Sequence, residues 1–363
     1  MKRRTFLKSA AVGLAGSPIA APAIAQNAPE LKWRLTSSFP KSLDILYGTA
    51  DLIAKRVAAA TDGKFQIGVF AANEIVPGLQ VLDAVQSGAV ECGHGPAYFY
   101  VGKDPTFAFD TAIPFGLNAR QQNAWMTHGG GRELMREFFK TYNVRQIPAG
   151  NTGAQMGGWF RNEIKTVDDL KGLRFRIPGI ASWVLAKLGV VPQQIAPGDI
   201  YPALEKGTID AAEFVGPYDD EKLGLSNVAQ YYYYPGWWEG SAQGSLFVNL
   251  DHWTALPESY QAIIEAACAE ANGWMVSKYD ASNMPALRRL VAAGTKLRPF
   301  SKEIMEACYK AAFELYDETA ANNSNFKKVY DPWKTFRQDI DLWFRVAEST
   351  YDNFINAKLA QSS

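Results

Sequence analysis

The chain has 363 residues, of which 47% are hydrophobic and 13% aromatic, enough to build the cores of two ordinary domains. It carries 37 basic and 37 acidic residues, so its net charge is zero, and this balance predicts no nucleic-acid partner and no anionic membrane surface as a partner. Three widely spaced cysteines, Cys92, Cys268 and Cys308, fit neither a disulfide framework nor a zinc site. We expect them to be buried free thiols.

Residues 1–25 are predicted to form an export signal. The pair Arg3-Arg4 gives a basic start, an apolar stretch runs from Ala10 to Ile19, and Ala23-Ile24-Ala25 supplies the small residues of a cleavage site. The paired arginines resemble the twin-arginine signal of bacteria, and an ordinary secretory signal is the alternative. Either signal predicts a mature chain that begins at Gln26 and is soluble in the periplasm.

Strand and helix patterns alternate through the first part of the mature chain. Leu31–Ser37 has the pattern of a strand, Leu43–Thr61 has the apolar spacing of a helix, and Asp62-Gly63 ends that helix. Such alternation indicates βα units around largely parallel sheets. The further elements expected up to residue 214 are strands at 65–70, 90–93, 144–149, 157–161, 174–177 and 211–214, and helices at 79–86, 118–139 (with a break near Gly129), 180–188 and 199–206.

Helices dominate the remainder of the chain. After a strand at 244–249 we expect helices at 258–279, 284–292 and 301–319, then a linker at Asn322–Asn325 and a last helix at 333–355. This last helix has an apolar stripe at helical spacing, made of Trp333, Phe336, Ile340, Trp343, Phe344, Ala347, Tyr351, Phe354 and Ile355. Because such a stripe must be buried, it packs either on its own domain or on a second subunit, and we predict a homodimer through this helix.

The sequence offers little support for an enzyme. His94, His128 and His252 are isolated from one another, and the chain has no phosphate-binding loop, dinucleotide-binding motif or nucleophile elbow. The acidic pairs Asp168-Asp169 and Asp219-Asp220 begin predicted helices, where we expect solvated caps. A hydrolase that uses Glu213 and Glu239 as a carboxylate pair remains a distant alternative.

Three segments carry a family resemblance. Thr166–Gly179, read as TVDDLKGLRFRIPG, resembles a motif of the extracytoplasmic solute-binding proteins of tripartite ATP-independent periplasmic (TRAP) transporters. Val81–Gly88 and Asp199–Glu213 resemble two of that family's helix-to-strand turns, and the resemblance covers nearly the whole mature chain in the same order. Glu213-Phe214 and the aromatic tail look most like the subfamily that binds 2-oxo and 2-hydroxy acids.

The resemblance implies an α/β fold of two domains, a type II-like periplasmic binding protein with crossing connections, plus a long C-terminal helix. We assign residues 26–150 and 244–283 to lobe I, residues 151–243 and 284–321 to lobe II, and residues 322–363 to the linker and the C-terminal helix. The two lobes are expected to close on a ligand and then to dock on integral membrane transporter subunits.

Arg176 is the residue that the family motif implies as the ligand's carboxylate partner. A guanidinium offers a planar fork of donors that matches a carboxylate with two parallel hydrogen bonds. Arg174 lies on the same face of the predicted strand, since strand side chains alternate, so alternation does not separate the two arginines. A structural salt bridge is the alternative role for either one.

Two carboxylates beside a ligand carboxylate would repel it, and a bound cation resolves this. Gln155, Glu213, the Phe214 carbonyl and Glu239 could supply the oxygen ligands that sodium or calcium requires. The resemblance implies such a metal, and we place sodium ahead of calcium. A turn-capping role is the alternative for Glu239.

Aromatic side chains are expected to close the pocket. Tyr98, Phe99 and Tyr100 follow a short strand and a Gly-Pro turn, where ligand loops of α/β sheets lie, and Trp237-Trp238 precede Glu239. Interdomain core is the alternative role for these rings. Asn151 and Gln243 are weaker polar candidates for ligand contact.

Together these features predict a periplasmic receptor for a short 2-oxo acid such as pyruvate, held by Arg176 and a cation. Receptors for C4-dicarboxylates or for 2-hydroxy acids such as lactate are the nearest alternatives.

Overall fold

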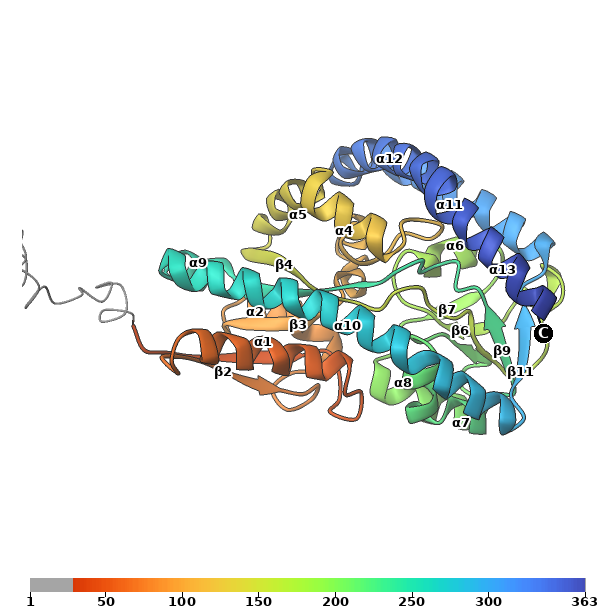
Figure 1. The fold of residues 1–363 in the computed structure, drawn as a ribbon, viewed down its shortest axis with the longest axis horizontal. Helices are drawn as coiled ribbons and strands as arrows, with labels where there is room; N and C mark the ends of the chain where they lie inside the picture. The colour runs from red at the N-terminus through yellow and green to blue at the C-terminus, as the bar shows by residue number, and fades with distance from the viewer. Residues whose placement is uncertain (1–28, 363) are drawn as a thin grey trace, which may run out of the picture.

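Two mixed β-sheets, each covered by helices, organise the structure (Figure 1). The structure is a computed structural model that describes residues 29–362, so the predicted export signal lies outside the described residues. No helix within that part of the chain is long and apolar enough to cross a membrane. The predicted α/β class is confirmed, and the chain crosses between the two sheets after β4, after β9 and along α10.

The first sheet has the strand order β2-β1-β3-β10-β4. Its strands are β1 (Leu31–Ser37), β2 (Phe65–Phe70), β3 (Cys92–Gly95), β4 (Val144–Asn151) and β10 (Gln243–Asn249). β1, β2 and β3 are parallel, and β10 runs antiparallel to both of its neighbours. α1 (Leu46–Ala60) packs on this sheet through buried residues at helical spacing, from Leu46 to Val57, as its sequence pattern predicts. α2 (Val81–Gln86) and α9 (Leu250–Thr254) flank the same strands.

The second sheet has the strand order β11-β9-β5-β8-β6-β7. Its strands are β5 (Gly158–Phe160), β6 (Arg174–Arg176), β7 (Val191–Gln193), β8 (Ala211–Ala212), β9 (Tyr231–Tyr234) and β11 (Lys296–Pro299), and its helices are α6 (Ala181–Lys187), α7 (Ile200–Glu205) and α8 (Pro217–Leu223). β5 is antiparallel to both neighbours, while β8, β6 and β7 are parallel. The sequence analysis did not predict β9 or β11, which pair with each other along one edge.

A single helix, α10 (Glu258–Ala292), runs across the whole molecule (Figure 1). The break expected between Tyr279 and Met284 is absent, and the helix continues through Pro285. Its first half, including Ile264 and Ala271, belongs to the core of the first sheet. Its second half, including Tyr279 and Leu290, belongs to a core of the second sheet. Burial along the full length therefore outweighs the local cost of the proline.

The helices between β3 and β4 agree more closely with the prediction from sequence. The helix expected at 118–139 is α4 (Ala119–His128) and α5 (Gly131–Lys140), and the predicted break is confirmed: Gly130 has φ +84°, in the left-handed region that favours glycine. α3 (Ala108–Thr111) precedes them. Short 3-10 turns lie at Gly78–Gln80, Ala97–Tyr100, Pro105–Phe107, Asp168–Leu170, Pro197–Asp199 and Leu225–Asn227. All three cysteines are buried free thiols, as expected.

The C-terminal region differs from the prediction. α11 (Lys302–Asn322) and α12 (Ser324–Phe344) are separated by Asn323 alone, whose side chain caps α12, so the predicted linker at Asn322–Asn325 is wrong. The last helix begins at Ser324, not Trp333, and continues through a π-helical segment (Arg345–Ser349) into α13 (Thr350–Ser362).

The apolar stripe of this region divides into two parts. Trp333 is fully buried on the chain's own core, with Phe336 and Ile340 packed beside it. Farther along, large apolar side chains are exposed, at Leu342, Trp343, Val346, Tyr351 and Phe354. Packing on the chain's own domain thus accounts for the first part of the stripe only.

One acidic pair is not solvated, contrary to expectation. Asp219 and Asp220 at the start of α8 are buried. The Tyr279 hydroxyl donates to Asp219, and the Trp159 indole and Tyr232 hydroxyl donate to Asp220 at 3.0 and 2.6 Å. These hydrogen bonds replace part of the lost hydration, one oxygen of each carboxyl stays without a partner, and burial raises the pKa of Asp219 to about 6 and that of Asp220 to about 7. Asp169 behaves as predicted, since it accepts from the backbone N–H groups of Lys165 and Thr166.

Candidate functional site

A cavity lies where residues of the two sheets meet. Residues at or near the carboxyl ends of β3, β6 and β8 line it, as is typical of ligand sites in α/β folds. The lining residues are Phe39, Leu46, His94, Pro96, Tyr98, Phe99, Thr152, Gln155, Arg176, Glu213, Phe214, Val215, Ala242, Gln243, Gly244 and Met275. Seven of the residues predicted to bind the solute or the metal are among them: Arg176, Gln155, Tyr98, Phe99, Glu213, Phe214 and Gln243.

Arg176 and Glu213 form a fully buried ion pair, with each side chain 1% exposed. Arg176 ends β6, Glu213 follows β8, and these two strands are parallel neighbours. The Nη1 of Arg176 donates to the Glu213 carboxylate and also to the Glu213 carbonyl at 2.8 Å, and the Nε donates to the Ile195 carbonyl at 3.1 Å. The third guanidinium nitrogen, Nη2, has no hydrogen bond to any residue that the structure describes.

Glu239 and Gln155 lie beside this pair. The Tyr98 hydroxyl and the Gln155 amide donate to the Glu239 carboxylate, and the Gln155 amide also donates to the Thr152 hydroxyl at 3.0 Å. Two oxygens, Oε2 of Glu239 and Oε1 of Gln155, are nevertheless buried without a hydrogen-bond partner. Such unsatisfied acceptors are costly unless a further partner, such as a cation, binds there.

Burial dominates the electrostatics of both carboxyl groups. It raises the pKa of Glu239 to about 7, against the opposing effect of the Arg176 guanidinium. It raises the pKa of Glu213 well above its usual range, again opposed by Arg176 and reinforced by Glu239. The site therefore contains two carboxyl groups but only one guanidinium to balance their charge. Both carboxyl groups are difficult to ionise at the same time.

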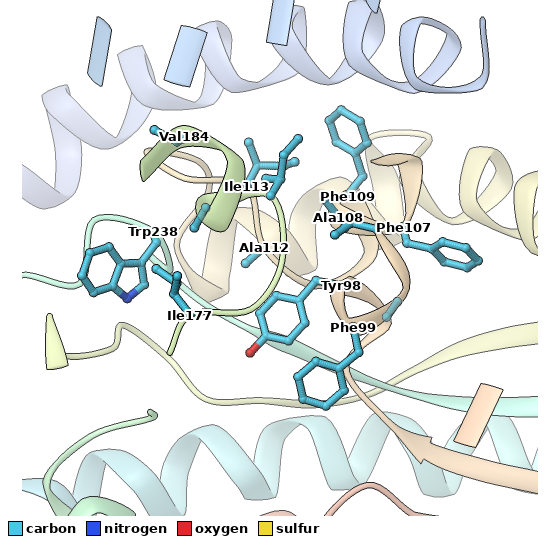
Figure 2. Packing of buried hydrophobic residues seen from close by; sticks show 14 of the residues in the cluster. Tyr98, Phe99, Phe107, Ala108, Phe109, Ala112, Ile113, Ile177, Val184 and Trp238 are labelled. Carbon is cyan, nitrogen blue, oxygen red and sulfur yellow. The ribbon is translucent and has the colours of Figure 1, made fainter. Parts of the chain in front are cut away.

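The aromatic wall comes from a different part of the chain. Tyr98 and Phe99 lie in the short turn after β3 and belong to the same buried hydrophobic cluster as Ile177 and Trp238 (Figure 2). The backbone at Gly179 approaches the Tyr98 ring so closely that a Cβ there would lie 2.8 Å from it, and Gly179 has φ +68°. The turn after β6 thus fits against Tyr98 only because it carries glycine.

Arg174, the alternative to Arg176, has a different environment. It forms an ion pair with Asp210 at 2.6 Å at the surface, where the two side chains are 43% and 28% exposed. It does not line the cavity. The structure therefore separates two arginines that strand alternation could not.

Several predicted residues, among them the predicted metal ligand Glu239, lie outside the cavity lining. The Tyr100 hydroxyl accepts from the Leu82 N–H at 2.9 Å and its ring packs in the core, so the predicted ligand contact by Tyr100 is not supported. The Asn151 side-chain oxygen accepts a hydrogen bond from the Gly153 N–H, and Asn151 is not among the lining residues. Trp237 stacks on Phe115, and Trp238 packs edge-on against Phe175, which is the interdomain-core role considered above.

The sequence analysis missed other lining residues, above all His94 and Thr152. His94 is the second-last residue of the short strand β3 and comes just before the Gly-Pro sequence that leads to Tyr98. That position at a strand's carboxyl end is the signal that could have identified it. The apolar lining residues, such as Leu46 and Met275, lie on helices in ordinary amphipathic patterns, and nothing in those patterns distinguishes a cavity from a core.

The four predicted metal ligands fit a cation that prefers oxygen. Glu239 and Gln155 offer the unpartnered oxygens described above, no described residue donates to the Phe214 carbonyl, and Glu213 adds a second carboxylate. The described residues contain no group of three or more His, Cys, Asp or Glu side chains suited to a metal ion. The donor set is therefore that of a sodium or calcium site and not of a transition metal.

The family follows from sequence comparison. A family model described as bacterial extracellular solute-binding protein, family 7, matches residues 36–323. The chain belongs to this family. Its relatives are TRAP transporter receptors that bind a solute outside the cytoplasm, so the chain is a transport receptor and not the hydrolase considered above.

Three relatives illustrate the similarity. The monocarboxylate 2-oxoacid-binding periplasmic protein of Nostoc sp. is 52% identical over 363 residues, which cover 98% of this chain and 100% of the relative. A TRAP solute-binding protein from Bordetella bronchiseptica, a mixed-occupancy dimer with calcium and picolinate in one active site, is 54% identical with a TM-score of 0.91 over 92% of this chain and 100% of its own. One from Pseudoalteromonas atlantica with bound sodium and pyruvate is 38% identical with a TM-score of 0.87 over 89% of this chain and 99% of its own.

Proposed function

We propose that this protein is the periplasmic receptor of a TRAP transporter for a short 2-oxo acid of the pyruvate type, held jointly by Arg176 and a bound cation. One observation carries the proposal: the Arg176 guanidinium, with a free nitrogen, and the unpartnered Gln155 oxygen line the same buried cavity, and Glu239, with its own unpartnered oxygen, lies beside them. The relatives that bind 2-oxoacids or pyruvate give the ligand class.

Arg176 is the anchor for the ligand's carboxylate. Its Nη2 is free, while Nε and Nη1 bond the Ile195 carbonyl and Glu213. When a cation attracts the Glu213 carboxylate, Nη1 becomes available beside Nη2, and the guanidinium can then hold a carboxylate through two parallel hydrogen bonds. Cation and acid therefore bind cooperatively in this proposal.

The cation would be held by Gln155, Glu213, the Phe214 carbonyl and Glu239. It supplies positive charge that polarises and neutralises the acid's oxygens, and the protein orients the acid through Arg176. Sodium was our prediction from sequence, and relatives contain either ion. The charges favour calcium, because two glutamates and the ligand carboxylate against one arginine leave two negative charges.

Calorimetry tests the proposal directly. The purified receptor, freed of metal by a chelator, would be titrated with pyruvate, 2-oxobutyrate, lactate and succinate, with sodium, with calcium and with neither. We expect tight pyruvate binding that requires one of the two ions. Tight succinate binding without a response to pyruvate would contradict the 2-oxo acid assignment.

We also propose that the exposed C-terminal segment, Leu342 to Ile355, mediates a homodimer. Trp343, Val346 and Phe354 are 60%, 70% and 61% exposed, which is unusual for large apolar side chains on consecutive helical turns. Sedimentation of a chain that ends at Asp341 tests this, because that truncation removes the whole exposed segment and leaves the buried Trp333 in place. An unchanged oligomeric state would contradict the proposal.

Two further elements of the function rest on the family and the sequence. The export signal at residues 1–25 would deliver the chain to the periplasm, and the liganded receptor would hand its acid to integral membrane subunits. Cell fractionation of the chain with and without Arg3-Arg4 changed to lysines tests the export route, since a twin-arginine signal loses function on that change.

A further inference from the structure

The neutral polar side chains of the cavity share one property: the protein uses their donors and leaves their acceptors without partners. The Gln155 amide donates to Thr152 and Glu239, and its Oε1 is unpartnered. The Gln243 amide nitrogen donates to the Asp110 carbonyl at 2.9 Å and to the Asp110 carboxylate at 3.2 Å, and its Oε1 is also unpartnered.

His94 follows the same rule. Its Nε2 lies 2.9 Å from the Ala149 carbonyl, which can only accept, so Nε2 carries the proton and Nδ1 is a bare acceptor. Nδ1 is buried and has no partner. Burial also lowers the pKa of His94 to about 4, so the ring is neutral near pH 7.

Asp110 fixes the orientation of the Gln243 amide. Asp110 is fully buried outside the lining and accepts from Gln146 at 2.6 Å and from Ser245 at 2.8 Å in addition to Gln243. The backbone carbonyl of Asp110 can only accept, so the Gln243 amide turns its nitrogen toward Asp110 and its oxygen away. Asp110 thereby acts as a positioning residue for Gln243.

We propose that His94 and Gln243, the latter oriented by Asp110, form an acceptor-only wall that excludes a second carboxylate from the cavity. This inference rests on the proposed function and names the residues that restrict the receptor to monocarboxylates. Among the lining side chains that the structure describes, Arg176 alone retains a donor without a partner, and one carboxylate occupies it. A second carboxylate would meet only acceptors and the apolar side chains of Leu46, Val215 and Met275.

The unpartnered donors nearby do not weaken this wall. The Asn151 amide nitrogen and the Trp237 and Trp238 indoles are buried without partners, but none of the three residues lines the cavity. The lining hydroxyl groups are committed, because Thr152 donates to the Gly153 carbonyl at 2.9 Å and Tyr98 donates to Glu239.

A matched pair of ligands isolates the effect. 2-Oxopentanoate and 2-oxoglutarate have the same five-carbon chain, and they differ only in a terminal methyl group or a terminal carboxylate. For the wild-type receptor with its cation we expect 2-oxopentanoate to bind at least about 100-fold more tightly, since a buried carboxylate without donors is strongly disfavoured. Equal affinities would overturn the inference.

Two variants test the assigned residues. Asp110→Asn replaces one of the two acceptors of the Gln243 amide with a group that can donate, which favours the flipped amide with its donor toward the cavity. His94→Gln keeps a donor for the Ala149 carbonyl while adding one for the ligand. In each variant we expect the preference for 2-oxopentanoate over 2-oxoglutarate, measured as the ratio of the two affinities, to decrease about tenfold. Asp219→Asn, which neutralises a buried aspartate away from the cavity, is the matched control and should leave the ratio unchanged.

The outcomes separate the two proposals. A ratio that stays at the wild-type value in both folded variants would overturn the wall, and if Asp110→Asn fails to fold, His94→Gln decides alone. Wild-type protein that binds neither pyruvate nor 2-oxopentanoate would instead refute the proposed function, and a wild type that binds 2-oxopentanoate but shows no discrimination refutes the wall only.

Discussion

Two ion pairs on one strand behave in opposite ways. Arg174 and Arg176 are two residues apart on β6 and each pairs with an acid beside β8, Asp210 and Glu213 respectively. The Arg174–Asp210 pair is at the surface, whereas the Arg176–Glu213 pair is almost fully buried and borders the cavity. Water solvates the first pair and makes it energetically minor, while the second retains its charges only through mutual contact and hydrogen bonds. Exposure, and not residue type or spacing, distinguishes the binding arginine from the structural one.

The sharpest test of this contrast is Arg176→Lys. The ammonium keeps the charge but loses the planar fork and the hydrogen bonds to Ile195 and Glu213. We expect the affinity for pyruvate to fall by about 2–5 kcal/mol, which corresponds to about 30-fold to several thousand-fold. Isothermal titration with saturating cation measures it, and an unchanged affinity would refute the role of the guanidinium.

Glu213→Gln should affect the empty receptor next most strongly. It leaves the buried Arg176 guanidinium without its anionic partner, which costs about 3–5 kcal/mol in the free energy of unfolding. Chemical denaturation of the metal-free protein measures this loss. Asp210→Asn, the corresponding change in the surface pair, is the control, and an equal loss in both variants would contradict the contrast.

Glu239, which lies beside the buried ion pair, and Asp210, which belongs to the surface pair, should contribute to stability with opposite pH dependence. Because the pKa of Glu239 is raised to about 7 in the folded chain, this group holds a proton that the unfolded chain loses near the ordinary value of 4.5. The contribution of Glu239 to the stability of the metal-free receptor should therefore fall as pH rises from about 4.5 to 7 and level off above it. Asp210 has a lowered pKa, chiefly through its hydrogen bond from Arg174, so its contribution is present above its usual pKa and is lost as pH falls.

Cation binding can be used to measure the ionisation of Glu239. A cation requires the ionised carboxylate, so calcium affinity should rise with pH up to about 7 and then become constant. Calorimetry at pH 6 in buffers of different ionisation enthalpy should detect protons released on calcium binding. In Glu239→Gln this release should decrease, and a release unchanged from wild type would exclude Glu239 as a ligand.

The smallest effect is expected for Arg174→Gln. The variant should bind pyruvate with wild-type affinity and melt at nearly the wild-type temperature, since an exposed pair contributes little. Differential scanning fluorimetry with and without ligand checks both points. A loss of binding would show that the two arginines act together, which the contrast between them denies.

Sequence reasoning succeeded where a local pattern determines the structure. The alternating elements from Leu31 onward and the break at Gly129-Gly130 follow from periodicity and from glycine, and the family motif pointed to Arg176. It failed where distant packing decides. Nothing local to Asp219-Asp220 shows that Tyr279, Trp159 and Tyr232 will donate hydrogen bonds to the pair in the core.

The same explanation covers the other errors. The break predicted before Pro285 was wrong because two separate cores hold the halves of α10. Tyr100 was assigned to the pocket on proximity to Tyr98, but the 3-10 turn directs its ring into the core. His94 was overlooked because an isolated histidine gives no spacing to read, and only the folded sheet places it beside Gly244 and Gln243.

In mechanical terms α10 is a beam shared by both halves of the molecule. At 1.5 Å per residue its 35 residues extend about 50 Å, and side chains brace it at both ends against separate cores. Rotation of one half against the other must therefore bend this beam or shear its packing. Gly273 lies between Ala271, in the first core, and Met275, in the other, and a side chain added there would meet no atom within 4 Å. At the changeover between the two cores α10 therefore has a position that faces open space, where a side chain can be introduced without contacting either core.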